Sequence, residues 1–288
     1  MRTALAAVLV TALVGPAVGQ DAVKYEIKVC RRKAGDRCKV TRTGVEDMTV
    51  TIKDGGAGQV VPYAATLTEA FTEHVEAVGG DGKPSRLTRA YTKARVAWAT
   101  PGVFGFEGKT VTIRRESGKS TYAVDGQPLA GTDAEQLDDE FKDPSVKRFE
   151  DFLPKETVQV GRGWTIPKVD PPAGFDRDGM RVTFDPTKRA AEGKLTKVYQ
   201  RDGRRFGVVT MTLTHPATRL KMGDEALLAA GSAVTEVVTA DWTIDGGPRV
   251  GTFGTATTVT LTAESPSGTV SVAGTSKFDE TVEPADKP

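Results

Sequence analysis

Alternation of apolar and polar residues with a period of two recurs along this 288-residue chain and limits it to a β-rich fold. Threonine occupies most of the polar positions, and the apolar ones hold mainly valine, isoleucine, leucine or methionine. This pattern is typical of half-buried antiparallel strands. The segments that show it best are DMTVTI, KTVTIRR, VVTMTLTH, SAVTEVVTADWTI and TTVTLTA. We therefore predict a mainly β fold, with antiparallel sheets arranged as a sandwich or a curved half-barrel.

The centre of the chain has a different pattern. TDAEQLDDEFKDPSVKRFEDFLP places apolar residues at helical spacing and predicts one or two short helices between two β-rich parts. The order of features before this segment resembles the order after it: KVCRRKAGDRCKV with KVYQRDGRRFGV, and TEAFTEHVEAVGGDG with TEVVTADWTIDGG. We interpret this as an internal duplication. It predicts a first half at 20–131, a helical or loop joint at 132–179 and a second half at 180–288.

The repeat resolves one ambiguity. TLTEAFTEHVEAV also fits an amphipathic helix, but its partner SAVTEVVTADWTI is too rich in β-branched residues for one. We predict strands for both.

The first nineteen residues, MRTALAAVLVTALVGPAVG, fit a secretory signal peptide. Arg2 supplies the positive charge, an apolar run follows, and Ala17 and Gly19 suit a cleavage site before Gln20. No later run reaches the roughly 18 apolar residues of a membrane helix. We expect a secreted or periplasmic protein with no membrane span in the mature chain.

Both cysteines lie in CRRKAGDRC, and export favours a disulfide between Cys30 and Cys38. Strand-like flanks around a turn-like KAGD predict a hairpin in which the two residues face each other, within disulfide reach. Redox and metal roles stay open as alternatives, although the spacing suits neither.

The net charge of +1 is too small for a general attraction to nucleic acid. Charge is nevertheless uneven, because residues 24–42 are mainly basic and residues 132–151 mainly acidic. Two interpretations stay open: solvated faces that meet each other, or a basic edge that holds an anionic partner. The candidate patch for such a partner is Arg31, Arg32, Lys33 and Arg37.

Motifs for catalysis are missing from the sequence. It has no G-x-S-x-G elbow, no phosphate-binding loop and no zinc spacing around His74 or His215. We predict no cofactor and no metal site. One pair of carboxylates stands out, because the repeat aligns Glu69 with Glu236 and both are in phase with apolar residues. Paired carboxylates can perform acid–base or glycosidic chemistry, so the two are the candidate catalytic residues.

The central LPKETVQVGRGW is similar to a joint found in uncharacterised secreted bacterial proteins with two like β-rich halves. The matching positions are Leu153, Pro154, Val158, Val160, Gly161 and Trp164. That resemblance implies no established activity. A weaker likeness, of architecture alone, is to periplasmic lipoprotein and lipid carriers.

Three functions follow as hypotheses. The first is an exported, non-catalytic envelope protein that binds an unidentified ligand or partner, or has a structural role. The second is a periplasmic carrier of a lipid or another apolar molecule, which requires an apolar cavity. The third is an exported hydrolase, which requires Glu69 and Glu236 to converge.

Overall fold

The computed structural model describes residues 23–28, 32–53, 58–98, 101–141, 149–167, 169, 176–177, 180–222, 224–248, 250–265 and 268–285. The helical elements are α1 (Thr132–Phe141) and the 3₁₀ turn η1 (Phe149–Phe152). The strands of the N-terminal part are β1 (Lys24–Tyr25), β2 (Arg37–Lys53), β3 (Gln59–Val78), β4 (Pro84–Ala97), β5 (Pro101–Val103), β6 (Thr110–Glu116), β7 (Lys119–Val124) and β8 (Gln127–Pro128). Those of the C-terminal part are β9 (Val158–Gln159), β10 (Gly163–Thr165), β11 (Asp176–Arg177), β12 (Met180–Phe184), β13 (Ala190–Arg201), β14 (Arg204–Met222), β15 (Asp224–Leu227), β16 (Ala233–Thr243), β17 (Gly251–Ser265) and β18 (Gly268–Pro284).

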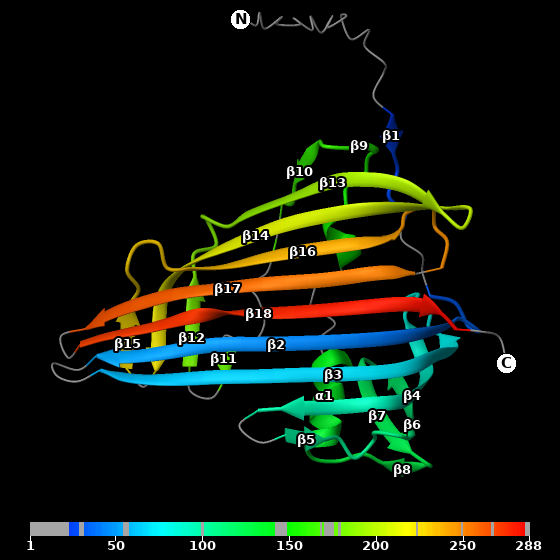
Figure 1. Ribbon diagram of the computed structural model, residues 1–288, viewed down its shortest axis with the longest axis horizontal. Coiled ribbons are helices and arrows are strands. Elements are labelled where there is room, and N and C mark those ends of the chain that lie inside the picture. Colours follow the sequence, from blue (N-terminus) through cyan, green and yellow to red (C-terminus); the bar gives the residue numbers. More distant parts are fainter. Residues whose placement is uncertain are drawn as a thin grey trace, which may run out of the picture.

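One open antiparallel sheet of 16 strands dominates the structure, as Figure 1 shows. Its main path runs β10-β13-β14-β16-β17-β18-β2-β3-β4-β6-β7-β8. The last strand, β18, pairs along its length with β2, so strands from the two ends of the chain meet in the middle of the sheet. The mainly β, antiparallel fold is thereby confirmed, as one large curved sheet beside a two-stranded sheet of β1 and β9.

Alternation along the strands separates the two faces as expected. Val209, Met211 and Leu213 of β14 are buried on the inner face, and Val259 and Leu261 of β17 are buried on the same face, beyond β16. The ambiguous segment TLTEAFTEHVEAV is part of β3, so the strand prediction is confirmed.

The dipeptide Asp-Gly occurs six times in the sequence, and two of these pairs form tight hairpin turns. Asp125-Gly126 joins β7 to β8, and Asp202-Gly203 joins β13 to β14. All four residues have positive φ angles, between 51° and 76°. A type I′ turn needs this conformation, which glycine and aspartate tolerate best.

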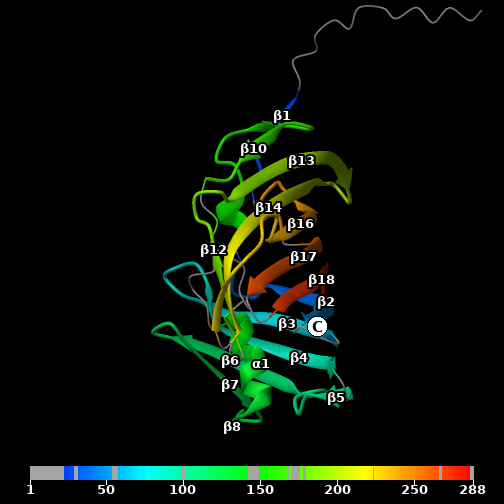
Figure 2. The ribbon, with the colours of Figure 1, turned by 90° about the vertical axis from the view of Figure 1, so that its left-hand side faces the viewer.

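The inner face of the sheet is covered in separate places, as the side view in Figure 2 shows. Helix α1 lies over the β4–β7 end, and β12 lies over the opposite side. Strand β14 takes part in both layers, because its first part pairs with β13 and β16 and its last residues pair with β12 and β15. The cover is therefore built from short segments.

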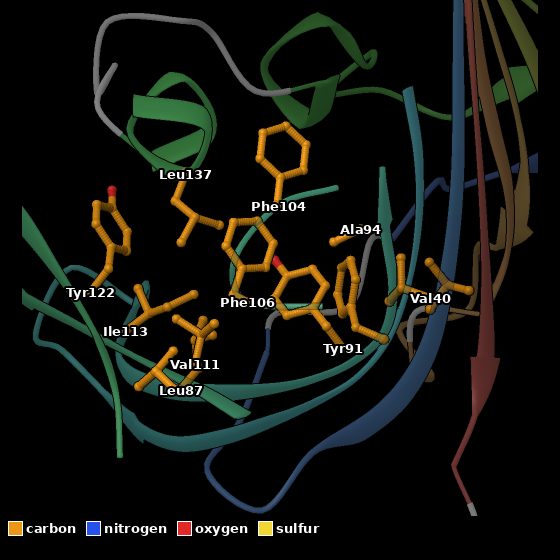
Figure 3. Packing of buried hydrophobic residues seen from close by; sticks show 13 residues of the cluster. Val40, Leu87, Tyr91, Ala94, Phe104, Phe106, Val111, Ile113, Tyr122 and Leu137 are labelled. Atoms are coloured by element: carbon orange, nitrogen blue, oxygen red, sulfur yellow. The ribbon is translucent and has the colours of Figure 1, made fainter. Parts of the chain in front are cut away.

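The core is divided into three clusters. The first, drawn in Figure 3, packs Leu137 of α1 against aromatic and aliphatic side chains from β4, β6 and β7 and the loop that holds Phe104 and Phe106. The second lies over β13, β14 and β16 and includes Trp242 and Ile244. The third joins Val182 and Phe184 of β12 to strands β14 and β16–β18.

The hairpin predicted for residues 28–40 is wrong. Both neighbours of β2 near Cys38 are other strands, because Cys38 pairs with Glu73 of β3 and with Pro284 of β18. The preceding segment instead pairs elsewhere, β1 with β9 and Lys28 with Asp245. Cys30 and Arg31 lie outside the described residues, so the disulfide stays a prediction.

Within each predicted half, the strands that contain the two repeated segments pair with each other. β2 pairs with β3, and β14 pairs with β16. A duplication requires this arrangement, but a simple antiparallel meander also produces it, so the duplication stays a prediction. Neither described helical element is long and apolar enough to cross a bilayer.

Candidate functional site

Six charged side chains gather on the inner face where α1 meets the sheet. We call them the arginine–glutamate cluster: Arg42 of β2, Glu69 and Glu73 of β3, Arg89 of β4, Glu140 of α1 and Glu280 of β18. They belong to segments up to 238 residues apart in the chain. Strand pairing explains their meeting, because Arg42 lies directly across from both Glu69 and Glu280, and Glu73 lies directly across from Arg89.

Glu140 is the centre of the cluster. Its carboxylate accepts hydrogen bonds from Nη1 and Nη2 of Arg89, both at 2.6 Å. The same carboxylate contacts Nη1 and Nη2 of Arg42 at 2.8 and 2.9 Å. Each arginine therefore presents its two-nitrogen fork to one carboxylate, the geometry in which guanidinium groups bind most strongly.

The remaining donors of the two arginines bind the sheet carboxylates. Nε of Arg42 donates to Glu280 at 2.8 Å, and Nε of Arg89 donates to Glu73 at 2.9 Å. Arg32 completes the group by an ion pair with the second oxygen of Glu73.

Aromatic rings enclose the two guanidinium groups. Cζ of Arg89 lies 4.4 Å from the ring centre of Phe71 and 4.8 Å from that of Phe141, and Arg42 lies 5.1 Å from Phe71. The side chains of Arg89 and Glu73 are each 1% exposed. Water is thus excluded from the Arg89–Glu73 pair, which strengthens this pair and makes an unpaired charge there costly.

The pKa values of the carboxyl groups in the cluster are shifted in different directions. Burial tends to raise the pKa of Glu140, but Arg89 and Arg42 outweigh it and hold that pKa well below its usual range. Burial also opposes ionisation of Glu73, yet Arg89 and Arg32 lower its pKa overall. Glu69 differs, because burial raises its pKa and Arg42, 3.5 Å away, offsets this only in part.

A second feature of the inner face lies directly beside the cluster. Two residues along from Glu280, Arg42 and Glu69 lie Phe278, Gly44 and Leu67, which pair across β18, β2 and β3. The line continues at right angles to the strands, and we call it the cross-strand row: Val96, Leu67, Gly44, Phe278, Thr255 and Val238. All of its members except Val238 are only half-buried.

Beyond Val238 the line enters the second cluster through Met211 and Gly193 and reaches Trp164 of β10. The Trp164 ring lies over Gly193, where a Cβ atom would be 2.2 Å from it. Its Nε1 donates to the Phe152 carbonyl at 2.9 Å. Trp164 of the LPKETVQVGRGW motif therefore packs against the core.

A polar line borders the row on its other side. It consists of Glu46, Ser276, Thr257 and Glu236 on four adjacent strands. The cross-strand row is thus a narrow apolar strip between the charged cluster and this polar line.

The two candidate catalytic carboxylates do not meet. Glu69 is on β3 and Glu236 is on β16, four strand spacings away, or about 19 Å along the sheet. Glu69 is 3% exposed and belongs to the arginine–glutamate cluster. The convergence that the hydrolase hypothesis requires is absent.

The predicted basic patch is divided by the fold. Arg32 turns inward to Glu73, whereas Lys33 and Arg37 are exposed. The basic and acidic segments do meet, through the contact of Arg42 with the partly exposed side chain of Glu140.

Neither histidine belongs to a chemical site. His74 is half-buried on the outer face of β3. His215 is 1% exposed and packs edge-on against Phe184, with ring centres 6.0 Å apart. Burial, followed by the nearby charge of Arg189, lowers the pKa of His215, so the ring is a neutral core residue. Within the described parts of the chain, no three His, Cys, Asp or Glu side chains are grouped to hold a metal ion.

A pocket of about 180 Å³ lies between the β3–β4 and β6–β7 turns. Its lining includes Asp81, Lys83 and Arg115, so it does not match the apolar cavity expected of a lipid carrier.

Sequence reasoning found only Glu69 among the members of the cluster. The signal that could have identified the others is phase: Arg42 follows Val40 by two residues, and Arg89 lies between Leu87 and Tyr91 at the same spacing. A charge in phase with buried positions needs a buried partner.

The burial of Glu236 on the inner face can be tested by the pH dependence of stability. Burial raises its pKa, and no arginine or lysine pairs with it among the described residues. Its contribution is therefore favourable below the unfolded-state pKa of about 4.3 and is lost as the pH rises through the folded-state value. Urea titrations between acid and neutral pH should show Glu236→Gln gaining stability over the wild type as the pH increases. Glu192→Gln, an exposed control on β13, should show no such trend; equal curves for both variants would contradict the assignment.

Comparisons with known proteins give low similarities. No protein-family model matches this chain, and no curated protein matches it. A structure of lipovitellin, described by its lipid–protein interactions, shares 8% identity and a TM-score of 0.41 over 89% of this chain. The chain spans only 26% of that protein. An outer membrane channel from Pseudomonas putida F1 shares 9% identity and a TM-score of 0.19, over 88% of this chain and 97% of the channel. Neither similarity carries an argument about function.

Proposed function

We propose that this is a non-catalytic binding protein that holds an apolar or amphipathic small molecule against the inner face of its sheet. The observation that carries the proposal is the cross-strand row. Phe278 and Leu67 lie on the face that the fold otherwise buries, yet they stay half-buried. Layered proteins normally cover such a face completely.

The divided core supports this proposal. Phe278, Gly44 and Thr255 belong to none of the three hydrophobic clusters, and Leu67 and Val96 pack only at the margin of the first. From Val96 to Val238 the row crosses five strand spacings, or about 24 Å. One leaflet of a bilayer is about 15 Å of hydrocarbon, so the row is long enough for a fatty acyl chain.

The ionisable groups beside the row favour binding over catalysis. Glu73, Glu140 and Glu280 each have an arginine nitrogen within 2.9 Å. Carboxylates held in this way are poor proton acceptors and nucleophiles. The N-terminal segment that resembles a signal peptide supports export, so we propose that the carrier acts in the periplasm or outside the cell.

The test is displacement of N-phenyl-1-naphthylamine, a neutral apolar fluorophore, by dodecanol. Phe278→Gln should weaken dodecanol binding by about tenfold, because the variant replaces an apolar contact by a polar one. The matched control is Val45→Gln. Val45 is one register position away, paired with Lys277 on the outer face, and is 47% exposed.

The two variants separate this proposal from general loss of structure. Val45→Gln should bind as the wild type does, and both variants should keep a cooperative thermal transition. Absence of binding to the wild type, or equal weakening by both variants, would show that the inner face is not the binding site.

A further inference from the structure

We propose that the Arg42 and Arg89 forks form the binding site for the anionic headgroup, a carboxylate or phosphate, of an amphiphilic ligand, and that Glu140 of α1 occupies this site in the unliganded protein. The proposal rests on the proposed function, since the apolar part of the same ligand lies on the cross-strand row. Glu140 is then a built-in competitor for the ligand.

The geometry of the forks matches such a headgroup. Two nitrogens of each arginine converge on the Glu140 carboxylate at 2.6–2.9 Å. The sheet fixes both arginines from behind, because their Nε atoms are held by Glu280 and Glu73. Removal of Glu140 would leave the forks oriented and preorganised for another carboxylate or a phosphate.

Glu140 is the member of the pairings that can leave. Its side chain is 30% exposed, against 1% for Arg89 and 11% for Arg42. It lies in the last turn of α1, which has no basic residue and where a negative charge is disfavoured by the helix dipole. The helix has independent anchors, Leu137 in the first cluster and the bond from the Gly105 amide to Asp133 at 2.9 Å. Rotation of one side chain would therefore vacate the forks.

The site adjoins the row at the correct distance. Arg42 and Gly44 are two residues apart on one face of β2, or about 7 Å. Gly44 has no side chain, so no atoms project from β2 between the side chains of Phe278 and Leu67. A headgroup at Arg42 would place the following methylene groups directly on this part of the row.

The balance of charges in the arginine–glutamate cluster also suits an incoming anion. Without Glu140, three arginines (Arg32, Arg42 and Arg89) face three sheet carboxylates (Glu69, Glu73 and Glu280). These charges cancel, so an incoming anion would take the place of the negative charge that Glu140 supplies to the two forks.

The experiment compares dodecanoate with dodecanol, which share one chain and differ in headgroup charge, by displacement of N-phenyl-1-naphthylamine from the full chain at neutral pH. Glu140→Gln removes the competing charge and should strengthen dodecanoate binding by about tenfold while dodecanol binding is unchanged. Glu140→Asp, which keeps the charge but withdraws it by one methylene, should have the same effect to a smaller degree. The control is Glu107→Gln, which removes another arginine-bound carboxylate, paired with the 55% exposed Arg95 and outside the arginine–glutamate cluster.

If Glu140→Gln lowers the stability of the protein, ligand-induced shifts in melting temperature provide a second measurement. Dodecanoate should raise the melting temperature of Glu140→Gln more than that of the wild type, whereas dodecanol should raise both equally. An equal change for acid and alcohol, or no gain from dodecanoate, would overturn the headgroup site. A rise of the same size with inorganic phosphate alone would show a site for free anions and overturn the amphiphile. The proposed function is tested separately, by the effect of Phe278→Gln on dodecanol binding. The headgroup site can therefore be disproved while dodecanol binding at the row is confirmed, and the reverse.

Discussion

Replacing Arg89 by methionine is expected to lower the free energy of unfolding by about 3–5 kcal/mol, because it removes one of the two arginines that bind the buried Glu73 and the partly exposed Glu140. Arg89 is 1% exposed and bonds Glu73, Glu140 and the Tyr91 hydroxyl. Methionine approximates the volume of the side chain, so most of the loss is electrostatic. Urea denaturation measures the difference, which is large beside the total stability of about 5–15 kcal/mol of most proteins.

The matched control is Arg95→Met. Arg95 also binds a glutamate by its fork, Glu107, but its side chain is 55% exposed. Solvent screening makes such a pair weak, so this variant should unfold close to the wild type. Equal losses from both variants would show that the arginine–glutamate cluster is not a buried network.

Gly193→Ala is expected to destabilise the protein by about 2–3 kcal/mol through overpacking and loss of a hydrogen bond. The added Cβ would lie 2.2–2.5 Å from three ring atoms of Trp164. The ring would have to leave Gly193, and its bond to the Phe152 carbonyl would break. The comparison is Gly102→Ala, where the new Cβ makes an ordinary contact with Val96 at 3.5 Å.

A double-mutant cycle identifies the cause. In a Trp164→Ala background the clash is gone, so Gly193→Ala should cost little or add slight stability, since alanine restricts the unfolded chain more than glycine. The same loss in both backgrounds would mean that Trp164 does not occupy the space above Gly193.

The sequence allowed prediction of what depends on local pattern. Alternation identified the strands around Met211, Trp242 and Leu261, and it did so because each strand has one buried and one solvated face. The Asp-Gly turns at 125 and 202 were also predictable, since the turn type constrains its own residues.

Features that depend on distant strand pairing were not predictable. The hairpin expected around KAGD assumed that neighbouring segments pair, but β18, from the other end of the chain, occupies that side of β2. The same long-range pairing brings Glu280 to Arg42 across 238 residues. No local periodicity shows which in-phase charges become partners, so the arginine–glutamate cluster appears only in three dimensions.

The apolar row and the Arg42 fork arise from one geometric fact, the continuous register from β16 to β3. Directly paired residues on adjacent antiparallel strands share a face. A charged line and an apolar line two residues apart are therefore carried across β18, β2 and β3 in parallel. The combination suits a molecule with a charged end and an apolar body.

Native mass spectrometry of the protein isolated from its native host, followed by organic extraction, tests ligand binding on the inner face most directly. We predict a reproducible bound mass that extracts as an apolar or amphipathic small molecule, that persists in Val45→Gln and that is lost or reduced in Phe278→Gln. A clean unliganded mass for the wild type, or an adduct unaffected by Phe278→Gln, would contradict binding at the cross-strand row.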